Sequence, residues 1–138
     1  MEAFKGKYDR TSDENYDKFL QALGVSLLLR TAAKASTPRI EITETNAVWT
    51  IKSSTILKTI KFEFKLNEEF EETTPDGRQV QSLATLEDGK LVLVQKAKKE
   101  KQKSTRTVHE RNGADELVLN LTVDGDEELV CVQKFKRV

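Results

Sequence analysis

The chain has 138 residues, of which 23 are basic and 23 are acidic. This length suits one domain with a core that needs no cross-links, and the balanced charge gives no reason to expect a nucleic-acid partner. Cys131 is the one cysteine, so an intrachain disulfide is excluded, and no apolar run approaches the roughly 18 residues of a membrane-spanning helix.

These features also indicate where the protein resides. A lone cysteine fits a reducing compartment, and the opening residues, Met1 to Lys5, hold no apolar signal segment. We therefore expect a single domain over residues 1–138, present as a monomer in the cytoplasm.

The first elements in chain order are a strand over residues 5–11 and a pair of short helices. Apolar side chains recur at the i, i+3, i+4, i+7 spacing of an amphipathic helix, at Tyr16, Phe19, Leu20 and Leu23. Gly24 is suited to end this helix. A second helix can begin at Ser26, and Pro38 prevents its continuation. The pattern predicts a helix hairpin over about residues 15–36.

Nine further strands are expected from Arg39 onward. Four of the six glycines come directly after Asp or Asn, and such pairs favour the positive φ angles of tight hairpin turns. The expected strands cover residues 39–45, 47–53, 58–66, 69–74, 79–87, 90–96, 103–111, 115–123 and 128–137. A meander of ten antiparallel strands has to close or cover its edges, so an all-β barrel is predicted.

The strand over residues 103–111 has no apolar face. Thr105, Thr107, His109 and Arg111 share one face, and the other face is also largely polar. A central strand of this kind packs into a dry core only at high cost, but it can line a cavity that holds water and a ligand. The alternative is an edge strand that is solvated on both faces. The cavity is favoured because the neighbouring strand over residues 115–123 is strongly apolar.

Several segments resemble the intracellular lipid-binding proteins, which include the fatty-acid-binding and cellular retinoid-binding proteins. Gly6-Lys7-Tyr8 resembles the family's Gly-x-aromatic opening, residues 15–25 its first helix, and residues 64–78 its central hairpin. The resemblance implies a ten-stranded antiparallel up-and-down flattened barrel of two orthogonal sheets with a helix-turn-helix lid. It also implies intracellular binding and transport of a fatty acid, retinoid or related lipid in an internal cavity.

The resemblance points to residues at the polar end of the ligand. Many members hold a ligand carboxylate with an arginine on the eighth strand and an Arg-x-Tyr on the tenth, and these positions align with His109, Gln133 and Phe135. A neutral Gln or His does not bind a carboxylate as an arginine does. Gln133 with Phe135 resembles the retinol-binding members, but those carry a glutamine at the position of His109. We therefore expect no fixed positive charge, so that neutral lipids bind as well as fatty acids at neutral pH.

The other candidate ligand contacts come from the remaining elements. Thr107 and Arg111 share the face of His109, Tyr16 lies on the first helix, and Phe62 lies on the apolar face of the strand over residues 58–66. Leu57 aligns with the family's portal loop, and Leu28 on the second helix faces that gap. The alternatives are a hydrogen-bonded bystander for His109, rim surface for Arg111 and plain packing for the two leucines.

Catalysis is not expected. One Cys and one His cannot form a Cys/His metal cluster, and Cys131 and His109 lie on separate strands with no residue to orient them as nucleophile and base. We predict a lipid carrier that needs no cofactor. The alternative is a structural or stress-protective member of the same fold with weak or vestigial ligand binding. The basic residues of the helix pair, Lys18, Arg30 and Lys34, are suited to transient contact with an anionic membrane.

Overall fold

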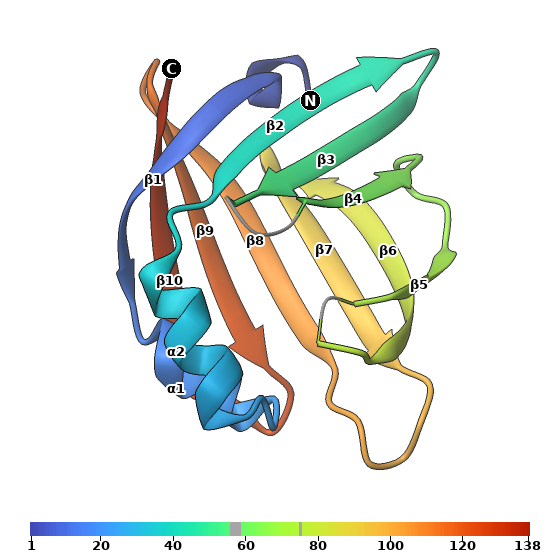
Figure 1. Cartoon of the computed structure of the whole chain (residues 1–138). Coiled ribbons are helices and arrows are strands. Elements are labelled where there is room, and N and C mark those ends of the chain that lie inside the picture. The colour runs from blue at the N-terminus through green and yellow to red at the C-terminus, as the bar shows by residue number, and fades with distance from the viewer. Residues whose placement is uncertain (56–58, 75) are drawn as a thin grey trace.

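The chain forms a nearly closed barrel of ten antiparallel strands, with two helices at one end (Figure 1). The computed structural model describes residues 1–55, 59–74 and 76–138. Around the barrel the strands follow the order β4-β3-β2-β1-β10-β9-β8-β7-β6-β5, so β4 and β5 are the two edges of the sheet. The predicted all-β barrel with a helix-turn-helix lid is confirmed.

The strands lie close to their predicted positions. The helices are a short 3-10 helix (Glu2–Phe4), α1 (Tyr16–Ala22) and α2 (Leu27–Ala35). The strands are β1 (Gly6–Glu14), β2 (Arg39–Thr45), β3 (Val48–Ser54), β4 (Thr59–Phe64), β5 (Phe70–Thr73), β6 (Gln79–Glu87), β7 (Lys90–Ala97), β8 (Thr105–Asn112), β9 (Glu116–Val123) and β10 (Asp126–Arg137).

Two tight turns show how the chain reverses. Asp88 and Gly89, with φ angles of 52° and 78°, join β6 and β7. Positive φ at both central residues gives the hairpin turn whose twist matches that of the flanking strands. Asn46 and Ala47 form a similar turn between β2 and β3, with φ angles of 51° and 67°. Because Ala47 is not a glycine, this turn lacks the Asn-Gly or Asp-Gly pair that marks several of the other hairpins.

Strand β1 continues to Glu14, beyond its predicted end at residue 11, and it contains a β-bulge. Arg10 pairs with Phe135 of β10, whereas Asp13 pairs with Gln133, and the register shifts between Arg10 and Ser12. Thr11 is therefore the extra residue of the bulge. Since alternate residues of a regular strand point to opposite faces, the bulge brings Asp13 to the same face as Arg10.

Strand β8 is central. It pairs with β7 on one side and with β9 on the other, so the interpretation of residues 103–111 as an edge strand is wrong. Thr105 and His109 on this strand are buried despite their polarity.

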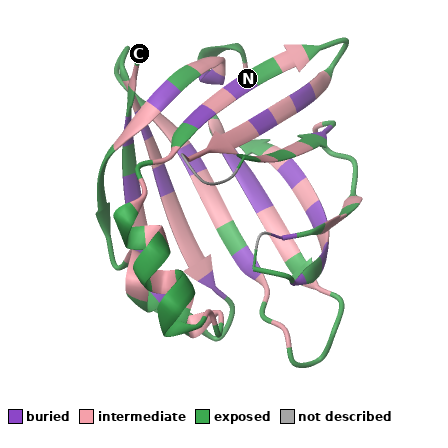
Figure 2. Cartoon of the chain, in the orientation of Figure 1, coloured by how far each residue is buried: buried purple, intermediate pink, exposed green. Residues whose placement is uncertain are grey.

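Buried positions alternate with more exposed ones along several strands (Figure 2), and most of the buried residues are apolar and form the core. Tyr8, Ile42, Leu117 and Phe135 are at most 1% exposed. A smaller cluster of Phe19, Val123 and Cys131 packs α1 against β9 and β10. In the described part of the chain, no helix combines the length and the apolar character needed to cross a membrane.

Candidate ligand-binding cavity

A cavity of about 290 Å³ lies inside the barrel, between the strands and the helices. Its size is at the low end of the range for small-molecule sites, roughly 300–1,000 Å³. Eleven of its nineteen described lining residues are apolar or aromatic, and the other eight are polar. The lining residues are Arg10, Tyr16, Ala33, Ser36, Pro38, Ile40, Ile51, Ser53, Thr55, Ile60, Phe62, Leu93, Gln95, Thr107, His109, Leu119, Leu121, Gln133 and Phe135.

Two hollows adjoin this cavity. One, of about 510 Å³, lies between the helices and strands β3 and β4, and it shares Tyr16, Ser53 and Ile60 with the cavity. The other, of about 560 Å³, lies between the sheet edges β4 and β5 and shares Phe62 and Gln95 with it. The cavity therefore borders one hollow beneath the helices and one between the two sheet edges.

His109, on β8, is a neutral hydrogen-bond acceptor toward the cavity. Its Nδ1 lies 3.1 Å from the carbonyl oxygen of Leu91 on β7, and because a carbonyl oxygen only accepts, Nδ1 carries the proton. Burial lowers the pKa of His109 to about 4, against the smaller opposite effect of this hydrogen bond. At neutral pH the second ring nitrogen, Nε2, is therefore unprotonated and accepts hydrogen bonds.

Gln133 and Phe135 line the same cavity from β10. Gln133 pairs with Leu119 of β9, which pairs in turn with His109, so these residues form one row across three strands. Gln133 is 7% exposed, and its carboxamide offers two N–H donors and an acceptor oxygen. The structure brings the three aligned positions together on one wall of the cavity.

Three other predicted contacts also lie on the cavity wall. Thr107 comes from β8, Phe62 from β4 and Tyr16 from α1. Burial raises the pKa of Tyr16, so its phenol stays protonated and can donate a hydrogen bond at neutral pH.

Arg10 is the charged lining residue that sequence reasoning missed. It is the one Lys or Arg among the described lining residues, and its side chain is only 10% exposed. The expectation of a site without a fixed positive charge is therefore wrong. A signal was present: Tyr8 is the aromatic residue of the opening motif and points inward, so Arg10, two positions later on the same strand, shares its face.

Arg111 does not line the cavity. Its guanidinium donates to the carbonyl oxygens of Ala3 and Ala114 and, over 3.1 Å, to that of Glu116. It also lies 5.5 Å from the centre of the Tyr8 ring. Arg111 thus ties the N-terminal segment to the β8–β9 turn, away from the position predicted for it at the ligand.

Leu28, one of the two predicted portal leucines, does not line the cavity. Leu28 is 79% exposed and lies on the outer side of α2, whereas its neighbour Leu29 lines the hollow beneath the helices. Successive residues of an α-helix are rotated by about 100° around its axis, so Leu28 and Leu29 face different sides of α2. Leu57 lies outside the described residues.

A carboxylate faces the hollow between β4 and β5. Glu72 on β5 accepts hydrogen bonds from Ser82 and from Gln95, at 2.5 Å and 3.1 Å, and Gln95 accepts one from Thr105 at 2.9 Å. Gln95 also lines the cavity. Its carboxamide is committed to this network, so it is a weaker candidate for a ligand contact than Gln133.

Cys131 lies in the small cluster beneath α1, and burial raises the pKa of its thiol to about 12. A thiol in this state is not a nucleophile at neutral pH. His109, the other half of the hypothetical catalytic pair, uses Nδ1 for Leu91. Within residues 1–55, 59–74 and 76–138, no group of three His, Cys, Asp or Glu side chains is placed to hold a metal ion.

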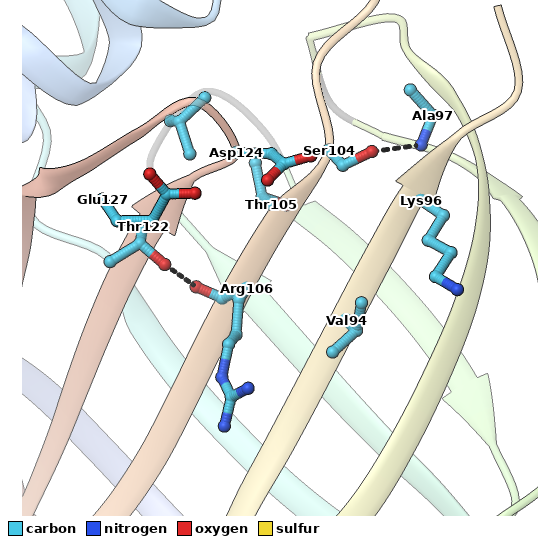
Figure 3. Close-up of a pocket in the computed structure, with 10 residues that line it drawn as sticks. Val94, Lys96, Ala97, Ser104, Thr105, Arg106, Thr122, Asp124 and Glu127 are labelled. Atoms are coloured by element: carbon cyan, nitrogen blue, oxygen red, sulfur yellow. Dashed lines mark hydrogen bonds between the residues drawn. The ribbon is translucent and has the colours of Figure 1, made fainter.

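A separate hollow of about 430 Å³ lies on the outer face of β7, β8 and β9 (Figure 3). Val94, Arg106 and Thr122 border it, and each alternates along its strand with residues that face the interior. The hydrogen bonds there are local, such as that from the Ala97 amide to Ser104 at 2.9 Å. This hollow shares none of its described lining residues with the internal cavity.

Comparison with known proteins agrees with this geometry. Residues 5–134 match the lipocalin / cytosolic fatty-acid binding protein family. The chain belongs to this family. Fatty acid-binding protein homolog 5 of Caenorhabditis elegans is 45% identical over 95 residues, which cover 69% of this chain and 70% of that protein. Cellular retinoic acid-binding protein 2 of Mus musculus is 37% identical over 140 residues, with 99% of each chain covered.

A solved structure extends the similarity to the whole fold. The crystal structure of apo lipid binding protein 8 of Caenorhabditis elegans superimposes with a TM-score of 0.94 at 28% identity, covering 100% of this chain and 97% of that one. Membership of the lipocalin / cytosolic fatty-acid binding protein family confirms the predicted function, which is binding and transport of a small hydrophobic ligand in an internal cavity.

Proposed function

We propose that the protein binds one single-chain lipid of the fatty-acid or retinoid class inside the barrel and carries it through the cytoplasm. The observation that carries this proposal is the cavity of about 290 Å³, whose wall combines eleven apolar or aromatic residues with eight polar ones. An apolar wall favours a hydrocarbon chain, and isolated polar groups fix its polar end. The relatives named for fatty acid and retinoic acid support these two ligand classes.

The residues favour a carrier over an enzyme. The one cysteine is a buried thiol, and the one histidine is neutral and engaged with a backbone carbonyl. The buried thiol is not a nucleophile at neutral pH, and an imidazole whose pKa is lowered to about 4 is a weak general base. The ligand is accordingly bound and released unchanged.

Calorimetric titration of the delipidated protein tests this function. Oleate, oleyl alcohol, retinoic acid and retinol serve as probes, with a long-chain alkane as the control that lacks a polar end. The proposal predicts one saturable site per chain for at least one of the four polar lipids. Absence of saturable binding for all of them would favour the alternative, a member of the fold whose ligand binding is vestigial.

We also propose that α2 touches an anionic membrane during transfer. Leu27, Leu28 and Leu29 are 68%, 79% and 60% exposed, so α2 presents an apolar surface to solvent (Figure 2). Residues 15–36 hold three basic residues and one acidic residue, a net charge of +2 in a chain whose net charge is zero. Exposed leucines beside a positive charge are suited to insert at the surface of anionic lipids.

A further inference from the structure

Arg10 and Asp13 form an ion pair on β1, in which Arg10 lines the cavity and Asp13 lies at its solvent-exposed margin. Arg10 pairs with Phe135 and Asp13 with Gln133, and both of these partners line the cavity. Residues paired directly across antiparallel strands point to the same face. Without the extra residue Thr11, Asp13 would face outward and could not meet Arg10 from within the same strand.

The guanidinium of Arg10 is held by three groups at the place where the cavity meets the helices. Nη1 lies 3.3 Å from the Asp13 carboxylate, and Nη2 donates to the carbonyl oxygen of Ser36 over 2.8 Å. The guanidinium carbon lies 5.9 Å from the centre of the Tyr16 ring. A guanidinium offers five N–H donors, so these contacts leave donors for a further acceptor.

Asp13 balances this charge only weakly. Its side chain is 32% exposed, whereas that of Arg10 is 10% exposed, so water competes for the carboxylate more than for the guanidinium. Gln133, directly across from Asp13, adds neutral N–H donors on the cavity wall. Together they form a place where a ligand carboxylate can replace Asp13 as the partner of Arg10.

We propose that Arg10 is the anchor for a lipid carboxylate in this cavity, with Asp13 as the internal counter-ion that the ligand displaces. The inference rests on the proposed function, since it concerns the polar end of the lipid that the cavity binds. It places the charge recognition on β1, and not at the aligned positions of β8 and β10, where this chain has His109 and Gln133. A planar guanidinium binds a carboxylate through two parallel hydrogen bonds, and an alcohol does not offer that geometry.

The test compares oleate with oleyl alcohol, which share the same hydrocarbon chain, at about pH 8 where the free lipid acid is ionised. In Arg10→Met the affinity for oleate should fall by at least about tenfold, the value of a lost charge-assisted hydrogen bond, while that for oleyl alcohol stays nearly unchanged. In Arg10→Lys part of the oleate affinity should return. Asp13→Asn should bind oleate more tightly than the wild type, because it removes the competing carboxylate.

The outcomes separate this proposal from its alternatives. If Arg10→Met weakens both lipids equally, Arg10 only clamps the end of α2 to β1, and the proposal is overturned. An unchanged oleate affinity in both Arg10→Met and Asp13→Asn also overturns it. If Arg10→Met does not fold, the higher oleate affinity expected for Asp13→Asn still tests the proposal. A wild type that binds neither lipid contradicts the proposed function itself, which is a different result.

Discussion

The Nδ1 of His109 lies 3.1 Å from the carbonyl oxygen of Leu91, and this contact fixes the proton of the one histidine in the chain. Burial lowers the pKa of His109 to about 4, from 6.5 in an exposed peptide. The imidazole is thus kept neutral on the cavity wall over the whole physiological pH range, with Nε2 available to accept a hydrogen bond.

This neutral histidine predicts a loss of stability in acid. Between the two pKa values the unfolded chain binds a proton that the folded chain does not bind, so the stabilisation is complete above about pH 6.5 and declines as the pH falls toward about 4. Each pH unit in that window costs about 1.4 kcal/mol, so lowering the pH from about 7.5 to about 5 should cost the wild type roughly 2 kcal/mol through this group.

Urea denaturation of the wild type and of His109→Gln at both pH values measures this contribution. The glutamine variant lacks the imidazole, so only its carboxylates titrate in this pH range. Its free energy of unfolding should therefore fall less between the two pH values than that of the wild type. An equal loss in the two proteins would show that His109 is protonated in the folded state or lies in contact with solvent.

Gln133→Arg should raise the preference for carboxylate lipids. The new guanidinium would lie on the cavity wall in the row of His109, on the strand next to Arg10. We expect the ratio of oleate affinity to oleyl alcohol affinity to increase by about tenfold, since a charge-assisted hydrogen bond contributes roughly 1.5–3 kcal/mol. Asn120→Arg is the matched control, because Asn120 lies between two cavity-lining residues of β9 and so points outward. A similar change in both variants would indicate a general charge effect.

Arg111→Met should destabilise the fold and leave lipid affinity intact. Arg111 donates to the carbonyl oxygens of Ala3, Ala114 and Glu116, and its guanidinium lies over the Tyr8 ring. Loss of these hydrogen bonds to a charged group should lower the free energy of unfolding by roughly 1–3 kcal/mol. Denaturation and oleate titration are measured on the same protein. A drop in oleate affinity at unchanged stability would show that Arg111 contacts the ligand.

Leu28→Asp should slow the transfer of lipid to anionic vesicles without weakening binding. Leu28 is 79% exposed and does not line the hollow beneath the helices, so a charge there alters the membrane contact and not the bound ligand. Stopped-flow transfer of a fluorescent fatty acid to vesicles rich in phosphatidylserine gives the rate. Leu86→Asp is the control, since Leu86 is also an exposed leucine, at 41%, but lies on β6 away from α2. Equal slowing in both variants would refute a specific role of α2.

The strands could be predicted from the sequence because their signals are local. Asp88-Gly89 marks its turn through the φ angles that glycine permits, and the polar residues Thr107 and His109 in an apolar surrounding indicated a cavity wall. The structure agrees with both. The sequence left open whether residues 103–111 form a cavity wall or an edge strand. The pairing of β8 with both β7 and β9 excludes the edge strand.

The parts that could not be predicted depend on contacts between distant residues. The bulge at Thr11 contains no glycine and becomes visible only through the register of β1 against β10, so the inward position of Asp13 had no sequence signal. Arg111 has the parity of a cavity residue, but its side chain reaches the N-terminal segment about a hundred residues away in the sequence. The exposure of Leu28 depends on how α2 rotates on the barrel, which helical spacing alone does not determine.

The single histidine offers the most direct test that lipid binds inside the barrel. The imidazole resonances of His109 are followed by NMR at about neutral pH while oleate is added to the delipidated, 15N-labelled protein. A ligand in the cavity should shift these resonances and saturate at one lipid per chain, with Nδ1 remaining the protonated nitrogen. Lipid that binds the protein calorimetrically while the His109 resonances stay unchanged would contradict the account, because the lipid would then lie outside the cavity that His109 lines.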